Sequence, residues 1–311
     1  MINFRYHLVS LTAVFLALAA GITIGAGVVD RATVTRIEGQ LRNVDSRREE
    51  TNAQNDRLKT DLGRWTKFSD QASGVVVEGR LTGATVFLVG TTGVDRQLVE
   101  DTRDTFTAAG ATVDGILWFT SKWALTNDDD IRRMAGVLDA APTTRPDDLR
   151  TAAIIGLTTA WNVGDSGPLG TSLLDAGFFE FDGPPTSTVP LIELPRAGSL
   201  FVVVSGDMAD VPPAQLAEPL VDRLSAMALP VLAAQPRRPV ATPATDAKKL
   251  PSEFVFALRD NSSVSGRIST VDNLDDPRGR ISTVLGLQAL RSGRPGHFGF
   301  GPDTRMVPEA R

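Results

Sequence analysis

The longest apolar stretch of the chain stands near its beginning and runs from Leu8 to Val29. It holds neither a charged residue nor a proline, and a helix of this length, rising about 1.5 Å per residue, crosses a hydrocarbon core of about 30 Å. We therefore predict one transmembrane helix within an anchor of residues 1–30. A cleavable secretory signal ending at residues 17–19 is one alternative, although the apolar run continues past that site. A buried core helix is another, but it is normally shorter or carries a polar stripe.

Small residues recur every four positions along this predicted helix, at Ala13, Ala17, Gly21 and Gly25. Gly21 and Gly25 form a GxxxG pattern, which lets two helix backbones approach closely in a membrane. We therefore take Ala17, Gly21 and Gly25 as candidate residues for dimerisation in the membrane. The alternative is that small residues are simply common in membrane helices.

The charges that flank the apolar run do not agree with the orientation that we expect. Arg5 precedes the run, and five arginines follow it closely, at positions 31, 36, 42, 47 and 48. Counted alone, this excess favours a cytoplasmic C-terminus. The short leading segment holds few cations, however, and long domains translocate largely regardless of their charge. We predict a single-pass membrane protein with a cytoplasmic N-terminus and an extracytoplasmic domain.

A heptad pattern follows the predicted membrane helix. With Val34 at position a, the a and d positions in strict 3-4 spacing are Val34, Ile37, Leu41, Val44, Arg48, Thr51, Asn55, Leu58, Leu62 and Trp65. Such spacing is typical of a coiled coil, in which polar residues at a positions cost stability and fix the register. We predict a homodimeric coiled-coil stalk over residues 31–72, with the seam residues Ile37, Leu41, Val44, Asn55, Leu58 and Leu62. A lone amphipathic helix folded back on its own domain is the alternative.

From residue 73 onward, short apolar runs alternate with amphipathic segments. Strands are predicted at 84–89, 112–119, 178–181, 199–204 and 231–234 and within 264–274. Helices are predicted at 95–109, 127–140, 147–161, 212–228 and 276–290, a loop at 142–146, a flexible turn at 164–170 and an exposed linker at 237–249. Strands that alternate with helices indicate a parallel sheet. We therefore predict an α/β domain over residues 73–311, with a parallel-leaning sheet and helices on both faces.

Composition narrows the classes of function. The net charge of -5 does not suggest a nucleic-acid-binding surface. The chain has no cysteine, which excludes disulfides, thiolate metal sites and cysteine nucleophiles. His297 is the one histidine outside the membrane region, and no Gly-x-Ser-x-Gly motif accompanies it. We expect no enzymatic activity and no bound cofactor.

Two regions carry the remaining candidate chemistry. The loops 90–93 and 205–207 follow buried strands, where an α/β sheet would form a cleft, but neither has the sequence of a phosphate-binding loop, and ordinary turns explain both. Near the C-terminus, the candidates for a metal site are His297, Met306 and Asp272. Asp272 belongs to a carboxylate group with Asp275 and Asp276 whose spacing matches no calcium loop. Helix capping explains Asp276 without a metal, and packing of the tail on the sheet explains His297.

Both ends of the chain resemble the actinobacterial MctB family of copper-transport proteins. The similarity lies in residues 2–19, in the block 268–274, in 279–281 and in Gly296-His297-Phe298-Gly299. It implies an actinobacterial envelope protein with an extracytoplasmic domain that serves copper export or homeostasis, and it is the one reason to expect a copper ion as a ligand. Copper(I) prefers cysteine, methionine and histidine, of which the chain offers few.

Two hypotheses on function therefore stand. The first, by resemblance, is a membrane-anchored envelope protein of copper export or homeostasis. The alternative is a non-catalytic dimeric scaffold of the envelope or the division septum. Its coiled coil would bind an envelope partner, namely a cell-wall remodelling protein. Direct copper binding would separate the two.

Overall fold

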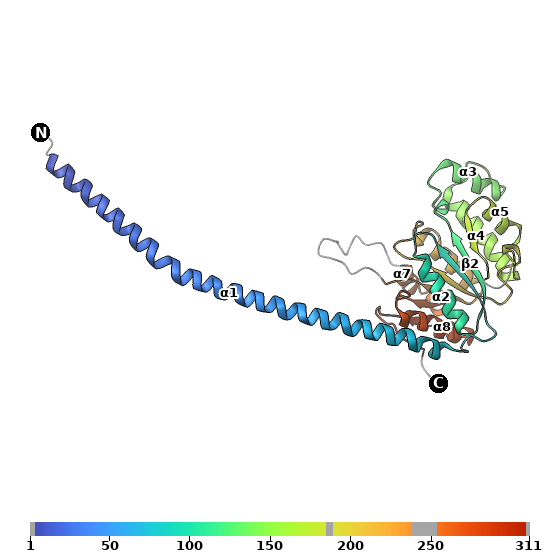
Figure 1. Cartoon of the computed structure of the whole chain (residues 1–311). Coiled ribbons are helices and arrows are strands. Elements are labelled where there is room, and N and C mark those ends of the chain that lie inside the picture. The colour runs from blue at the N-terminus through green and yellow to red at the C-terminus, as the bar shows by residue number, and fades with distance from the viewer. Residues whose placement is uncertain (1–3, 185–188, 238–253, 309–311) are drawn as a thin grey trace. The chain divides into compact units, whose positions relative to one another are not determined.

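The computed structural model describes residues 4–184, 189–237 and 254–308, and for residues 4, 26–35 and 70 it describes the backbone alone. The chain divides into two compact units, residues 1–66 and 67–311. One continuous helix, α1 (Phe4–Val77), makes up the described part of the first unit and begins the second (Figure 1). The segment boundaries predicted at residues 30 and 72 both fall within α1, and the predicted linker 237–249 lies outside the described residues except for Arg237.

The beginning of α1 has the length and composition of a membrane span. Its section Arg5–Gly25 is apolar, and none of it is buried by the rest of the chain. The described residues thus hold one apolar helix of this kind, with bounds a few residues earlier than the predicted run. Gly39 and Gly63 do not interrupt α1.

A seven-stranded sheet forms the centre of the second unit. Its strand order is β3-β2-β1-β4-β5-β6-β7. The strands are β1 (Thr85–Thr91), β2 (Thr112–Phe119), β3 (Phe179–Asp182), β4 (Leu200–Val204), β5 (Val231–Ala234), β6 (Ser269–Val271) and β7 (His297–Phe298). β3 pairs antiparallel with β2, and the other neighbouring strands pair in parallel. The prediction of a mainly parallel α/β sheet is confirmed.

Seven α-helices and four described 3-10 turns connect these strands. The helices are α2 (Arg96–Ala108), α3 (Asp128–Val137), α4 (Pro146–Val163), α5 (Gly167–Asp175), α6 (Ala217–Ala226), α7 (Phe254–Asp260) and α8 (Pro277–Arg291). The turns are η1 (Ser121–Ala124), η2 (Leu191–Glu193), η3 (Pro213–Gln215) and η5 (Ser265–Arg267). Three helix starts follow from their caps, because Asp95, Asn127 and Asp276 each accept a hydrogen bond from a backbone N–H of the first turn.

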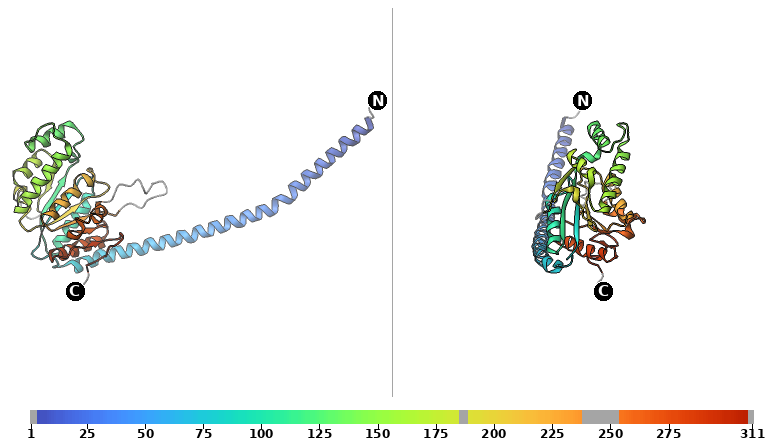
Figure 2. Two further views of the ribbon diagram at one scale, coloured as in Figure 1. Left: turned by 180° about the vertical axis from the view of Figure 1, so that it is seen from behind. Right: turned by 90° about the vertical axis from the view of Figure 1, so that its right-hand side faces the viewer.

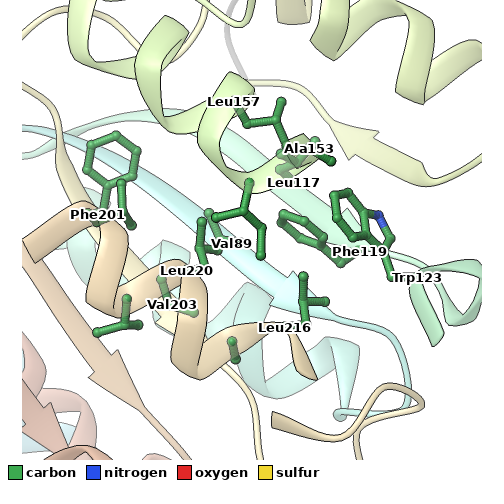
Figure 3. Packing of buried hydrophobic residues seen from close by; sticks show 14 of the residues in the cluster. Val89, Leu117, Phe119, Trp123, Ala153, Leu157, Phe201, Val203, Leu216 and Leu220 are labelled. Atoms are coloured by element: carbon green, nitrogen blue, oxygen red, sulfur yellow. The ribbon is translucent and has the colours of Figure 1, made fainter. Parts of the chain in front are cut away.

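Helices cover both faces of the sheet, as predicted. On one face, Val89, Phe201 and Val203 of the strands point toward Leu157 of α4 and Leu220 of α6 (Figure 3). On the other face, α2 and α8 pack against the sheet together with the last residues of α1 (Figures 1 and 2). Alternate residues of β4 and β5 enter the two cores, which is why these strands are apolar throughout.

The flexible turn predicted at 164–170 is wrong in its second half, because α5 begins at Gly167. Pro168 lies in the first turn of that helix, where backbone N–H groups have no partner within the helix, so the N–H that proline lacks costs no hydrogen bond. A Cβ on Gly170 would lie 2.5 Å from the Ser166 Cβ, so this glycine permits close packing and does not mark flexibility. The helix predicted at 212–228 is likewise divided into η3 and the shorter α6.

Candidate functional site

The order of the strands places a topological switch point between β1 and β4. From β1 the chain proceeds to β2 on one side, whereas β4 and the later parallel strands lie on the other side. Ligands of open α/β sheets bind beyond the carboxyl ends of the strands at such a point. The predicted loop 90–93 begins too early, because Gly90 and Thr91 are the last residues of β1 and pair with β2. Thr92 and Gly93 follow β1 and residues 205–207 follow β4, so both segments lie at the position where a cleft would form.

Residues 208–210, which come directly after the second loop, pack on the end of the first loop. The backbone N–H of Asp210 donates to the carbonyl oxygen of Thr92 at 2.7 Å. A Cβ on Gly93 would lie 2.2 Å from the carbonyl oxygen of Met208, and Gly93 has a φ of +92°, which favours glycine. Backbone therefore fills the space between the loops, and the loops form packed turns.

The chemically richest group of side chains lies farther along the same edge, at the ends of β6 and β7. Arg259 reaches it from α7 and pairs with Asp272 through Nη1 and Oδ2 at 2.7 Å. The same guanidinium donates from Nε to Thr270 Oγ1 at 2.8 Å and from Nη2 to the carbonyl oxygen of Phe298 at 3.0 Å. It also lies 5.0 Å from the ring centre of Phe256. Arg259 thus joins α7 to both β6 and β7.

Asp272 in turn holds the segment that follows β7. Its Oδ1 accepts from the N–H of Phe300 at 2.7 Å and its Oδ2 from the N–H of Gly301 at 3.1 Å. Gly299 has a φ of +134°, and a Cβ there would lie 1.9 Å from Asp272 Oδ1. With one arginine and two N–H groups around it, the Asp272 carboxylate is already well satisfied, which argues against a cation at this residue.

His297 is connected to this group through Thr270, whose Oγ1 lies 2.9 Å from His297 Nδ1. Arg259 Nε can only donate, so Thr270 Oγ1 accepts from it and has its own hydrogen to give to Nδ1. We assign the proton of the neutral imidazole to Nε2 on this basis. Burial, followed by the positive charge of Arg259, lowers the pKa of His297 and favours the neutral form.

The imidazole of His297 also lines a cavity of about 340 Å³. Arg294, Asp303 and Arg305 contribute the charged side chains of the lining, and Pro295 and Phe298 contribute apolar parts. Two arginines beside a histidine that donates from Nε2 make this cavity a poor environment for a copper ion. Their charge and their hydrogen-bond donors instead match anions and hydrogen-bond acceptors.

The two other carboxylates of the C-terminal group are paired as well. Asp275 Oδ2 lies 2.8 Å from Arg237 Nε, and Asp276 Oδ2 lies 2.8 Å from Arg278 Nη2. The hydrogen bond from Arg278 is the main reason that the pKa of Asp276 is lowered. The ring of Phe300 lies 4.9 Å from the guanidinium carbon of Arg278. Asp272, Asp275 and Asp276 are therefore each balanced by an arginine.

The third metal candidate, Met306, lies in the segment after β7. Its carbonyl oxygen accepts a hydrogen bond from Ser282 Oγ of α8, and it is not among the residues that line the cavity at His297. Within the described residues, no three side chains of the histidine, aspartate and glutamate type come together as a metal site would require. The structure thus brings Asp272 and His297 into one hydrogen-bonded network and leaves Met306 outside it.

Arg259, the residue at the centre of this network, is not among the site residues predicted from the sequence. A single arginine at the end of a short helix has no motif around it, and its partners lie in two segments up to 39 positions away along the chain. One signal was present: an arginine next to apolar residues in Phe254–Asp260 requires a buried partner if the segment is buried.

The candidate residues of α1 are all on the surface of the single chain. The large apolar seam residues Ile37, Leu41, Val44, Leu58, Leu62 and Trp65 are between 57% and 67% exposed. Nothing lies within 4 Å of a Cβ built on Gly21 or Gly25. The seam is therefore an apolar surface that this chain does not cover in the structure.

Comparison with known proteins gives relatives over the whole chain. A family model described as "Copper transport outer membrane protein, MctB" matches residues 1–308. The protein named Copper transporter MctB of Mycobacterium tuberculosis is 24% identical over 332 residues, which cover 99% of this chain and 99% of the relative. The protein of the same name from Mycobacterium leprae is 27% identical over 323 residues, which cover 97% of both. The matches extend across the apolar helix and the α/β unit alike.

Proposed function

Because the chain belongs to the MctB family, we propose that it is a membrane-anchored protein of the cell envelope that serves copper export or copper homeostasis. The observation that carries this proposal is the family match over residues 1–308, which includes the apolar helix as well as the α/β unit. The mycobacterial relatives are named copper transporters, and they match at nearly full length. The first hypothesis of the sequence analysis is thereby retained.

We propose that the section Arg5–Gly25 crosses the membrane with the N-terminus in the cytoplasm, so that the α/β unit lies outside the cell membrane. The length of this section suits a span, and a tilt of the helix would accommodate a small mismatch. A cysteine placed in the α/β unit of this cysteine-free protein tests the orientation. The expected result is labelling of Ser263→Cys, an exposed position, by a membrane-impermeant maleimide in intact cells.

We propose further that the chain works as a parallel homodimer joined along α1. Apolar side chains at a and d positions that are about 60% exposed in one chain favour a coiled-coil partner, since contiguous exposed apolar surface of this kind marks an interaction site. Asn55 at an a position would fix the register of such a pair. The proposed dimer is independent of the route that copper takes.

We propose that the protein supports copper transport without a resident copper ion in the C-terminal network. Copper(I) prefers soft sulfur ligands and imidazole, whereas Asp272, Asp275 and Asp276 are hard ligands that already pair with arginines. Its role would then depend on assembly in the envelope and on the partners of the α/β unit.

The decisive experiment is a gene deletion scored for copper tolerance. The deletion strain is complemented with the wild-type chain and with a chain in which Leu11 and Leu18 are both changed to Asp, so that it cannot span a membrane. We expect copper sensitivity that the wild type corrects and the double variant does not. Unchanged copper tolerance of the deletion, together with a defect in cell separation, would overturn the proposal and favour the scaffold hypothesis.

A parallel measurement on the purified full-length chain in detergent addresses copper itself. A copper(I) titration in competition with a chelator is expected to show no stoichiometric binding. Tight binding lost in His297→Gln would contradict the absence of a resident ion and would identify His297 as a ligand.

A further inference from the structure

The membrane section of α1 has a shallow groove on one side. The groove is lined by Leu8, Val9, Thr12, Ala13, Leu16, Ala17 and Ala20. The Thr12 hydroxyl donates to the carbonyl oxygen of Leu8 at 2.8 Å, so its polar group is satisfied within the helix. The groove is therefore apolar and fit to receive side chains of another helix in lipid.

The groove continues the heptad register of the stalk. Counting back in sevens from Val34 at position a places Gly27, Ala20 and Ala13 at a positions. Counting back from Ile37 at d places Asp30, Thr23, Leu16 and Val9 at d positions, of which Asp30 and Thr23 are polar. Because α1 is one continuous helix from Phe4 to Val77, this phase is carried from the stalk into the membrane. The groove and the exposed seam of the stalk thus belong to one stripe.

We propose that two copies of the chain pair in parallel along one continuous seam from Val9 to Trp65, with Val9, Ala13, Leu16 and Ala20 forming its membrane part. This inference rests on the proposed homodimer and adds the face on which the membrane helices meet. Small residues at a and larger ones at d give the alternation that lets side chains of one helix fit between those of the other.

A second copy of this chain is the occupant that the register fits. Two chains anchored in one membrane by the same end run in the same direction, as a parallel coiled coil requires. In a parallel pair in register, each g position faces the e position five residues later in the partner. These pairs are Gln40 with Asp45, Arg47 with Asn52, Gln54 with Lys59, and Asp61 with Thr66, and none of these four pairs joins two like charges. Within the seam itself, Arg48 at an a position and Asp30 at a d position each face the same residue of the second copy, which costs stability.

This geometry turns the GxxxG residues away from the partner. At 100° per residue, Gly21 lies about 100° and Gly25 about 140° around the helix from Ala20. A pair held through Gly21 and Gly25 would be a right-handed crossing, whereas the heptad seam requires a left-handed one. One continuous helix pair does not satisfy both, and the heptad seam, which is longer, would bury more side chains than the two glycines.

The absence of cysteine allows a test by single-cysteine cross-linking without background. Full-length variants in native membranes, each with one cysteine at Ala13, Ala20, Gly21 or Gly25, are oxidised with diamide. Leu41→Cys, at an a position of the stalk, serves as the reference for the dimer, and Ala53→Cys, at the outward f position, as the negative control. We expect Ala13→Cys, Ala20→Cys and Leu41→Cys to cross-link several-fold more than Ala53→Cys, and Gly21→Cys and Gly25→Cys to remain near that control.

The outcomes separate the seam from the dimer. Suppose that Leu41→Cys, Gly21→Cys and Gly25→Cys cross-link whereas Ala13→Cys and Ala20→Cys do not. The homodimer would then be retained and the continuous seam would be wrong. Failure of Leu41→Cys to cross-link, while Leu58→Cys at a d position also fails, would overturn the homodimer and the seam with it.

Discussion

Arg259 and Asp272 form an ion pair in which Nη1 and Oδ2 are 2.7 Å apart and the two side chains are 9% and 3% exposed. The pair connects α7 to the residue that follows β6, and both partners are hydrogen-bonded to the segment around Phe298. Two buried charges at this distance stabilise a fold only as long as both are present, because either alone would remain desolvated without compensation.

The first prediction is that Arg259→Met destabilises the α/β unit by about 3–5 kcal/mol, since it leaves the Asp272 carboxylate buried without its cation. Urea unfolding followed by tryptophan fluorescence measures the effect, because Trp118, Trp123 and Trp161 are fully buried. The matched control is Arg132→Met, which removes an exposed ion pair with Asp129 and should cost at most about 1 kcal/mol. Equal losses in the two variants would show that the buried network is not what stabilises this end of the sheet.

The second prediction concerns His297 and pH. Its pKa is lowered in the folded protein, so the unfolded chain takes up a proton more readily as the pH falls below the ordinary value of 6.5. Stability that is fully present above 6.5 is therefore lost on acidification toward the folded-state pKa. We expect the urea midpoint of the wild type to fall between pH 7.5 and pH 5.5 by more than that of His297→Gln.

The comparison with His297→Gln is needed because other groups titrate on the acid side. Burial raises the pKa of Glu218 above its ordinary value of 4.5, so this group lowers the stability as the pH rises above 4.5, which is the opposite of the effect of His297. The hydrogen bond from Arg278 lowers the pKa of Asp276, so this group lowers the stability only as the pH falls below 3.8. Both contributions are shared by the wild type and the variant, so the difference between them reports His297. An identical pH dependence in the two proteins would contradict the assignment of a neutral, half-buried imidazole.

The third prediction tests a close approach of backbones at the start of α8. A Cβ on Gly279 would lie 1.9 Å from the carbonyl oxygen of Asn273, which is backbone and cannot rotate away. Gly279→Ala should therefore destabilise the domain by about 1–3 kcal/mol, as overpacking does elsewhere. Gly266→Ala is the control, since nothing lies within 4 Å of its Cβ, and its thermal midpoint should stay close to that of the wild type.

Much of the fold could be predicted because local signals agree with the tertiary structure. β2 and β5 occupy the predicted residues, since unbroken apolar runs between turn residues suit strands that are buried on both faces. Asp95 and Asp276 marked helix starts that the structure confirms. The helix α5 was missed because its glycines and proline indicate a turn locally, whereas contacts with Ser166 and the burial of Leu173 stabilise a helix.

The candidate site was less accessible to sequence reasoning. Asp272 and His297 were recognised as unusual, but the residues that determine their chemistry, Arg259 and Thr270, carry no motif. The pairing of β6 with β7 brings Thr270 beside His297, and a strand of two residues gives no periodic signal. A cluster of aspartates thus resembled a cation site in sequence while arginines from three separate segments neutralise it in the fold.

The fourth prediction concerns Asn55, the polar a position of the stalk. Two asparagines that face each other in a parallel dimer can hydrogen-bond in register, at the expense of apolar packing. Asn55→Ile should therefore raise the thermal midpoint of the helical signal in circular dichroism and, because isoleucine at a relaxes the restriction to one register, add species larger than the dimer in light scattering. Ala53→Ile places the same side chain at the outward f position and should do neither. A rise in both variants would mean that isoleucine acts through helix propensity or general hydrophobicity, and no change in Asn55→Ile would place Asn55 outside any helix interface.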